Sequence, residues 1–312
     1  MDRRPGHPGL HSPEGLEVAD PALTERLFVL GQYLLPKRAL TAAAGAVASA
    51  RGKRWSAALI RWFVRRYRVD MGEAAQADIT RYASFNDFFT RALKHGARPL
   101  ADADLVCPVD GSISQFGAIE QGLIVQAKGH RYSTRTLLGG DAAFAARFDD
   151  GHFATLYLSP KDYHRIHMPC EARLKRMVHV PGALFSVNPA TARGVPGLFA
   201  RNERVICEFE SVHGPLALVL VGATIVGSIA TAWHGVVSPP RGGPVRSWDY
   251  ADQPLLLSKG EEMGRFLLGS TVIVMLPRGP LRFNTGWRSG GNVRLGEAMA
   301  DRPDDSTGDE AD

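Results

Sequence analysis

Cysteine and long apolar runs are scarce in this chain of 312 residues, and each shortage excludes a class of protein. The three cysteines, Cys107, Cys170 and Cys207, show no paired spacing and leave one thiol over, so we expect no disulfide framework and a reducing compartment. The best candidate for a spanning helix, Ala39 to Ala50, has twelve residues without a charge, whereas a bilayer needs about eighteen. The sequence therefore predicts neither a disulfide-rich domain nor a helix that crosses a membrane.

Two further absences concern export and hydrolase chemistry. The first twenty residues carry Asp2, Glu14, Glu17 and Asp20 where a secretory signal has a basic start and an apolar centre, so we expect no such signal. The Gly-x-Ser-x-Gly turn that presents the nucleophile of many hydrolases does not surround Ser270. Both absences count against an exported hydrolase.

What the chain does have is an uneven distribution of its net charge of +5. Residues 24–69 contain ten Lys or Arg and one acid, Glu25, so this stretch carries +9 and the remainder −4. Asp301 to Asp312 instead holds six acids, which is typical of a solvated tail, and we predict an acidic disordered tail over residues 287–312. Residues 1–21, rich in Pro and Gly, are also expected to be disordered.

A basic amphipathic helix is predicted within the stretch 22–70, which has a helical pattern with breaks at Pro36 and Gly52. At about 100° per residue, one narrow arc gathers arginines and the other side gathers apolar residues. These are Arg54, Arg61, Arg65 and Arg68, against Trp55, Leu59, Trp62, Phe63 and Tyr67. Such a helix suits an anionic membrane surface, where each nearby cation adds roughly 1 kcal/mol. The alternatives are a helix packed on the rest of the protein, or one that binds nucleic acid.

From Leu105 onward the pattern changes to short β-like runs separated by Gly and Pro. The runs cover residues 123–127, 153–158, 205–209, 216–221, 224–229 and 271–276. Before them, Ser84 is placed to cap the start of a short helix. The predicted fold class is therefore α+β, with N-terminal basic amphipathic helices followed by a mainly antiparallel β domain.

Candidate reactive groups appear at Gly269-Ser270. Because glycine has no Cβ and tolerates unusual backbone angles, the Ser270 Oγ can bend back and attack the preceding peptide bond. The alternative is an ordinary turn. His164 and His167, three residues apart, and Asp110 in a tight turn supply the other parts of a charge-relay set. Any long chain contains these residue types, so the constellation alone is a weak signal.

Seven local strings are more specific, and together they resemble the pyruvoyl-dependent phosphatidylserine decarboxylases of the bacterial membrane-associated type. In chain order they are Phe88–Lys94, Pro108–Gly111, Tyr163–Pro169, Pro181–Asn188, Leu198–Arg204, Val221–Ile229 and Leu268–Thr271. The resemblance runs from about Ser84 to Leu276. Its specificity comes from the agreement of seven separate strings.

The resemblance implies that Ser270 becomes a cofactor. Its Oγ would attack the Gly269 carbonyl and form an ester, and elimination and hydrolysis would then release ammonia and leave a pyruvoyl group at a new amino terminus. His167 is the expected base, because a hydroxyl needs a neutral imidazole within hydrogen-bond reach. Asp110 is expected to fix the His167 tautomer and steady the imidazolium.

The second reaction implied is the decarboxylation of phosphatidylserine to phosphatidylethanolamine, a step of phospholipid biosynthesis. The substrate amine would form a Schiff base with the pyruvoyl ketone at residue 270, which accepts electrons that no side chain can accept. Carbon dioxide would leave and a proton would return to Cα. His164 is the candidate for a role in decarboxylation or proton transfer.

These expectations set boundaries along the chain. Residues 22–83 would form a helical membrane-association region, and residues 84–286 the catalytic decarboxylase domain. Self-cleavage would produce a large β chain, 1–269, and a small α chain, 270–312, which stay together as a heterodimer with further oligomerisation left open. We expect a peripheral protein on the cytoplasmic side of the cell membrane. Its partners would be phosphatidylserine and an anionic membrane surface, without nucleic acid.

Three other interpretations are weighed against this one. His164, His167 and Cys170 are equally spaced like metal ligands, but a fourth ligand is lacking and Pro169 disrupts a shared helix, so no metal is predicted. A serine hydrolase could use Ser270, His167 and Asp110 on an external acyl substrate. A non-enzymatic membrane-binding module could be built on the basic helices.

Overall fold

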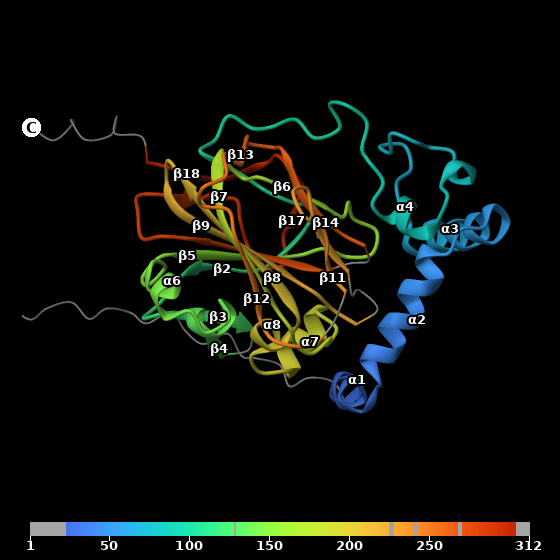
Figure 1. The fold of residues 1–312 in the computed structure, drawn as a ribbon, viewed down its shortest axis with the longest axis horizontal. Helices are drawn as coiled ribbons and strands as arrows, with labels where there is room; N and C mark the ends of the chain where they lie inside the picture. Colours follow the sequence, from blue (N-terminus) through green and yellow to red (C-terminus); the bar gives the residue numbers. More distant parts are fainter. Residues whose placement is uncertain (1–22, 128, 225–227, 240–241, 268–269, 304–312) are drawn as a thin grey trace, which may run out of the picture.

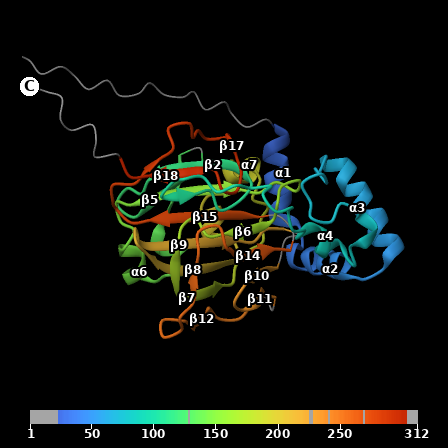
Figure 2. The same ribbon diagram turned by 90° about the horizontal axis from the view of Figure 1, so that it is seen from above.

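The computed structural model describes residues 23–303, apart from 128, 225–227, 240–241 and 268–269. Figure 1 shows a β domain with a helical region along one side, and Figure 2 shows the same arrangement from a perpendicular direction. The predicted α+β class, with helices before a mainly antiparallel β region, is confirmed. The predicted disordered segment 1–21 lies outside the described residues.

Three helices make up the helical region: α1 (Leu23–Leu34), α2 (Lys37–Ser49) and α3 (Lys53–Tyr67). Pro36 and Gly52 occupy the N-cap positions of α2 and α3, so both predicted breaks are confirmed. Proline suits the start of a helix because it has no amide hydrogen to leave unsatisfied. Within the described residues, every helix is too short or too polar to span a bilayer.

The short helix α4 (Phe85–Phe89) begins where the sequence predicts. The Ser84 hydroxyl accepts a hydrogen bond from the Asp87 amide at 3.1 Å, which is the usual contact of a serine N-cap. A 3₁₀ turn, η1 (Ile79–Arg81), precedes it. Phe88 and Phe89 are fully buried and join α4 to the β domain and to α3.

Helix α3 buries only part of its predicted apolar face. The ring centre of Phe63 lies 5.0 Å from that of Phe85, so this side chain packs into an aromatic cluster. Trp55 and Trp62, placed on the same face by the sequence, are 38% and 57% exposed. The apolar face is thus divided between the protein interior and the surface.

A nine-stranded antiparallel sheet forms the centre of the β domain. Its main path runs β12-β7-β8-β9-β15-β5-β2-β17, and β13 pairs with β7. The strands are β2 (Gly111–Ala118), β5 (His152–Tyr157), β7 (Ala172–Val180), β8 (Arg204–Ser211), β9 (Gly214–Val221), β12 (Arg246–Asp249), β13 (Leu256–Leu257), β15 (Thr271–Leu276) and β17 (Asn292–Val293). Strand β15 therefore lies between β9 and β5.

Smaller sheets and short helices surround the large sheet. A four-stranded sheet contains β11 (Gly235–Ser238), β10 (Ile229–Thr231), β14 (Glu262–Phe266) and β6 (Arg165–His167). The others are β1 (Leu105–Val106), β18 (Ala298–Asp301) and β16 (Arg282–Phe283), and the pair β3 (Leu123–Ala127) and β4 (His130–Ser133). The helices are α5 (Thr134–Leu137), α6 (Ala142–Ala146), α7 (Pro189–Gly194) and α8 (Leu198–Arg201). Five of the six predicted β runs coincide with strands; the sixth, 224–229, contains residues outside the described part.

Both faces of the large sheet are buried, which explains why its central strands read as continuous apolar runs. In β15, Val272 and Val274 face one apolar cluster, while Ile273 and Met275 face another. Alternate residues of a strand point to opposite faces, so a strand covered on both sides needs apolar residues at every position. The three cysteines are also buried and free, as expected.

The C-terminal segment corrects the predicted boundary of the tail. Residues 287–303 do not form a separate acidic tail, because β17 pairs with β2 and β18 pairs with β1 and β16. The acids that suggested a tail lie mainly beyond residue 303, where the described part of the chain ends. The folded domain therefore extends past the predicted limit at residue 286.

Candidate active site

Ser270 lies immediately before β15, in the middle of the large sheet. Its side chain is fully buried, and its Oγ donates a hydrogen bond to the carbonyl of Val221 at the end of β9. Its own carbonyl accepts a hydrogen bond from the Leu158 amide at 2.9 Å, just past the end of β5. Gly269, the predicted partner in self-cleavage, lies outside the described residues. The Ser270 hydroxyl is thus sealed from solvent between two strand ends.

His164 is fully buried beside the segment that leads to Ser270, because its carbonyl accepts the Phe266 amide at 3.0 Å. Nδ1 lies 2.8 Å from the carbonyl of Asp162, and since a carbonyl only accepts, the proton of the neutral ring sits on Nδ1. Nε2 has no hydrogen-bond partner in the described part of the chain, and the ring centre lies 4.0 Å from that of Phe89. Burial lowers the pKa of His164 to about 3, so the ring is neutral at neutral pH.

His167 is the last residue of β6 and is held at both ring nitrogens. Nδ1 lies 2.8 Å from the Gly260 carbonyl, and Nε2 lies 3.1 Å from the Tyr163 hydroxyl. By the same reasoning, Nδ1 donates to Gly260 and Nε2 accepts from Tyr163. Burial lowers the pKa of His167, although the bond to Gly260 partly opposes this shift. Burial also raises the pKa of Tyr163 to about 12, so its hydroxyl keeps its proton.

Asp110 is held in place by Arg98, an arginine outside the seven strings. Arg98 donates from Nε to Oδ1 at 2.9 Å and from Nη2 to Oδ2 at 2.6 Å. The Leu295 amide donates to Oδ1 at 2.9 Å. Arg98 Nη2 also contacts Glu73 at 2.7 Å, and the bonds to the two carboxylates raise the pKa of Arg98. The Asp110 side chain therefore has a fixed orientation.

Sheet register brings Asp110 and Ser270 to the same end of the large sheet. Ser112 of β2 and Thr271 of β15 both oppose Tyr157 of β5, from its two sides. Since both strands run antiparallel to β5, the residues that precede them emerge at its C-terminal end. They are two strands apart, which corresponds to about 10 Å. His164 and His167 follow shortly after β5 in the chain, and each is tied by a backbone hydrogen bond to one of these two segments.

The tautomer of His167 is the point at which the structure differs from the sequence prediction. The His167 amide donates to the Pro108 carbonyl at 2.9 Å, which sets β6 beside the turn of Asp110. Yet the proton on Nδ1 is held by Gly260, whereas the prediction assigned this role to Asp110. Asp110 acts on His167 only through space, where its negative charge favours the imidazolium form. A role for Asp110 in steadying the imidazolium stays a prediction.

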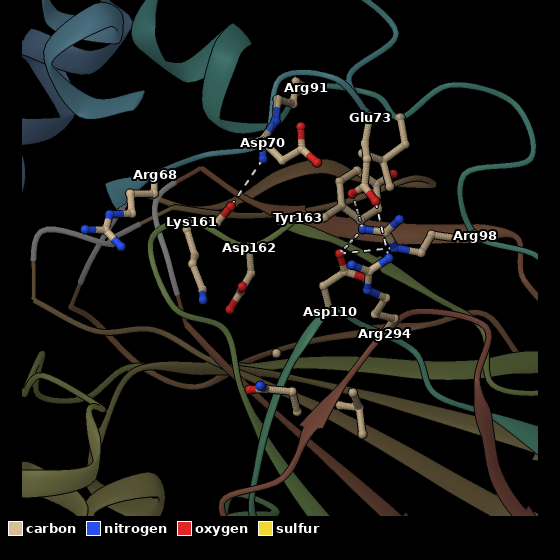
Figure 3. A pocket seen from close by; sticks show the side chains of 14 residues that line it. Arg68, Asp70, Glu73, Arg91, Arg98, Asp110, Lys161, Asp162, Tyr163 and Arg294 are labelled. Carbon is tan, nitrogen blue, oxygen red and sulfur yellow. Dashed lines mark hydrogen bonds and ion pairs between the residues drawn. The ribbon is translucent and has the colours of Figure 1, made fainter. Parts of the chain in front are cut away.

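A charged pocket of about 290 Å³ opens beside Asp110 (Figure 3). The charged residues that line it are Arg68, Asp70, Glu73, Arg91, Arg98, Asp110, Lys161, Asp162 and Arg294. Tyr163, which contacts His167, also lines it, so the pocket adjoins the histidines. A volume near the lower end of the usual range for small-molecule sites suits a small polar group.

Several of these groups carried no usable signal in the sequence. Gly260 contributes a backbone carbonyl, and any residue type offers that group. Arg98 is an isolated arginine, a residue common on any protein surface, and Arg91 lies in the string Phe88–Lys94 without a pattern that marks it as a ligand-binding residue. Tyr163 lies four residues before His167 in one of the seven strings, and this spacing was the one clue to its contact.

Two further polar residues of the β domain make structural contacts. Arg165 pairs with Glu262 at 2.7 Å. His179 is fully buried, and its Nε2 lies 2.9 Å from Glu203. Among the residues that the structure describes, no three His, Cys, Asp or Glu side chains are grouped as a metal site would require.

The fold and the site together define a class of protein. A serine sealed in a sheet, two imidazoles whose pKa values are lowered by burial and an adjoining charged pocket are features of an enzyme rather than of a passive membrane-binding module.

Comparison with known proteins narrows this class. A family model described as phosphatidylserine decarboxylase matches residues 85–301, and one described as PSD matches residues 27–68. Relatives named phosphatidylserine decarboxylase proenzyme include those of Methylibium petroleiphilum, 70% identical over 281 residues, and Albidiferax ferrireducens, 68% identical over 279 residues. These alignments cover 90% and 89% of this chain and 99% and 98% of the relatives. The chain therefore belongs to the phosphatidylserine decarboxylase family of carboxy-lyases.

Proposed function

We propose that this chain cuts itself between Gly269 and Ser270, converts Ser270 to a pyruvoyl group and then decarboxylates phosphatidylserine to phosphatidylethanolamine. The observation that carries the proposal is the burial of Ser270 at the start of a central strand, at the same end of the sheet as the segment of Asp110. The relatives are named proenzymes, a name that refers to a precursor.

The first step needs a base for the Ser270 hydroxyl. The neutral His167 ring has its lone pair on Nε2, and this lone pair can accept the proton when Oγ attacks the Gly269 carbonyl, once the Tyr163 hydroxyl has released it. Oγ must turn away from the Val221 carbonyl to do so. The peptide nitrogen becomes the amine of the resulting ester. Elimination then frees the Gly269 carboxylate, and water replaces the nitrogen as ammonia leaves.

The surroundings of Ser270 fit a pyruvoyl group. The residue is excluded from water, and the strand ends at Val221 and Leu158 hold its backbone. A pyruvoyl ketone supplies the electron sink that decarboxylation of an amino acid requires. The Nε2 of His164 has no partner among the described residues, so its lone pair is free to take part transiently in the proton transfer to Cα.

The two chains would remain together after cleavage because of the position of β15. This strand pairs with β9 on one side and β5 on the other, and both belong to the part before residue 270. Strands β17 and β18, also after the cut, pair with β2 and β1. A cut at the start of β15 leaves all these ladders intact, so we infer a stable heterodimer of the chains 1–269 and 270–312.

The helical region supports attachment to a membrane surface. Leu23, Leu27, Leu30 and Leu34 recur at helical spacing along α1, and they are 72%, 58%, 60% and 87% exposed. The opposite side of α1 is docked on the β domain, since Glu25 pairs with Arg193 of α7 at 2.6 Å. A row of exposed leucines beside a basic helix suits an anionic lipid surface. We infer peripheral attachment on the cytoplasmic side of the cell membrane.

The intact mass of the purified protein tests the proposal directly. Two fragments that meet at 269/270 are expected, the smaller one blocked at its amino terminus and reactive with hydroxylamine. Ser270→Ala should abolish both cleavage and the release of carbon dioxide. A single chain of 33.8 kDa that decarboxylates phosphatidylserine would contradict the proposal. An intact chain labelled at Ser270 by a fluorophosphonate would favour a serine hydrolase instead.

A further inference from the structure

Arg91 is a buried cation with few partners. Its side chain is only 5% exposed, and its guanidinium lies over the Phe88 ring at 5.4 Å. Nη2 donates one long hydrogen bond, 3.3 Å, to the Lys161 carbonyl. Nε is buried and has no hydrogen-bond partner among the described residues. A buried guanidinium with unused donors is costly unless an anion completes its contacts, so Arg91 points to a ligand.

The pocket that Arg91 lines has more positive than negative charge. Its walls carry five cations and four carboxylates. Arg98 and Arg294 are satisfied, because both pair with Glu73 and Arg98 also holds Asp110. The cations left over are Arg68, Arg91 and Lys161, and within the described part of the chain none of their side chains forms an ion pair (Figure 3).

The two remaining acids form hydrogen bonds with their own neighbours, and the charge of Asp162 also acts through space on Arg91 and Lys161. Asp70 accepts a hydrogen bond from the Gly72 amide at 2.7 Å. Asp162 accepts from the amide and the hydroxyl of Ser159, each at 2.7 Å. The net excess of one positive charge in the pocket lining matches a ligand group with one negative charge.

We propose that Arg91, with Arg68 and Lys161, forms the subsite that holds the phosphodiester of the substrate headgroup. This inference rests on the proposed function. A phosphodiester carries one negative charge and keeps it throughout the reaction, and guanidinium groups bind phosphate oxygens in charge-assisted hydrogen bonds.

The substrate carboxylate is a poorer match for these cations. Its negative charge leaves the carboxylate as the bond to carbon dioxide breaks. A cation that held the carboxylate would therefore stabilise the ground state more than the transition state and slow the reaction.

The location of the pocket agrees with this assignment. Asp162 and Tyr163 line it and directly precede His164, and the positive charge of Arg91 is one cause of the lowered pKa of His164. In the headgroup, the phosphodiester is joined to Cα through one oxygen and Cβ, so its subsite must adjoin the reacting carbon. Arg68 follows the end of α3, so the pocket also reaches the helical region, where the acyl chains would remain in the lipid.

The test uses the processed protein and a soluble probe, so that membrane attachment plays no part. Glycerophosphoethanolamine presents a phosphodiester without a carboxylate, and its dissociation constant can be measured by calorimetry. We expect Arg91→Gln and the double variant Arg68→Gln/Lys161→Gln to weaken its binding about tenfold or more. The KM for phosphatidylserine in detergent micelles should rise more than kcat falls. The control, Arg81→Gln, removes an arginine whose side chain is 71% exposed and lies outside the pocket, and should match the wild type.

Other results would overturn the assignment. Unchanged binding of glycerophosphoethanolamine in the double variant would do so, and this variant changes two exposed side chains, so it remains decisive if Arg91→Gln fails to fold. Weakened binding of O-methylserine instead would show that the cations hold the carboxylate. Binding of inorganic phosphate without any binding of glycerophosphoethanolamine would indicate a site for free phosphate. Failure of the proposed function is seen separately, as wild-type protein that is neither cut at 269/270 nor active.

Discussion

The helical region and the β domain use leucine and other apolar residues in opposite ways. Strand β15 buries all six of its residues, because neighbouring strands and two apolar clusters surround it. Helix α1 leaves a row of four leucines exposed while its other side docks on α7. Burial of β15 stabilises the folded domain, whereas the leucines of α1 add to stability only when an external apolar phase covers them. The same residue type is thus buried in the core in one region and exposed in the other, where we propose that it serves membrane attachment.

The largest effect expected is on the proposed self-cleavage, whose residues all lie in the β domain. His167→Gln removes the proposed base, so the chain should remain uncut, and intact mass after purification measures this. His95→Gln, an exposed histidine outside the site, should be cut like the wild type. Cleavage of the His167 variant at the normal rate would show that His167 is not the base for self-cleavage.

Two leucine variants, one in each region, compare how much a buried and an exposed leucine contribute to stability. Leu218→Ala in β9 removes a fully buried side chain and should lower the free energy of unfolding by about 2–5 kcal/mol. Leu34→Ala in α1 removes a side chain that is 87% exposed and should change it by less than about 0.5 kcal/mol. Urea unfolding of both variants in the uncut Ser270→Ala background gives the two values. Equal losses would mean that α1 is covered by protein in solution.

Binding to membranes should depend on the exposed leucines of α1, which contribute little to stability in solution. The triple variant Leu27→Ser/Leu30→Ser/Leu34→Ser removes three exposed leucines and should weaken binding to vesicles that contain phosphatidylglycerol roughly a hundredfold. Self-cleavage should be unaffected. Val212→Ser, which changes an equally exposed residue of the β domain, is the control and should bind normally. Normal sedimentation of the triple variant with vesicles would exclude α1 as the attachment surface.

The smallest effect concerns pH and a single buried histidine. Burial lowers the pKa of His164 from 6.5 to about 3, so between these values the unfolded chain binds a proton that the folded chain does not. The contribution of His164 to stability is therefore complete above pH 6.5 and declines as the pH falls, by about 2 kcal/mol on reaching roughly pH 5. Urea unfolding of Ser270→Ala with and without His164→Gln should show that the second change removes this part of the pH dependence. Identical pH profiles would contradict the burial of a neutral ring.

Local structure followed from local residue patterns in most places. Pro36 and Gly52 separate the three helices, Ser84 caps α4, and five of the six predicted apolar runs coincide with strands. The strands β17 and β18 were missed because two and four residues are too few to show a periodic pattern. Their stability comes from pairing with β2 and β1, which lie far away in the sequence.

The site was predictable as a set of residues but not as a set of contacts. The seven strings pointed to Asp110, His164, His167 and Ser270, and sheet register brings Asp110 and Ser270 to one end of β5. Backbone hydrogen bonds tie the two histidines to the segments before β15 and β2. The contact of His167 with Gly260 and that of Asp110 with Arg98 join residues without a shared motif. Such pairings depend on how β6, β14 and the turn before β2 pack together, and no single segment contains that information.

By itself, the sequence determined the α+β class, the basic helical region, the family and the residues to examine, because these depend on composition, periodicity and short strings. Only the tertiary structure decided that Ser270 is sealed from water, that Gly260 holds the His167 tautomer and that Arg91 is buried with unused donors. Burial and hydrogen bonding depend on distances between segments that are remote in the chain. Those distances exist only once the sheets have formed.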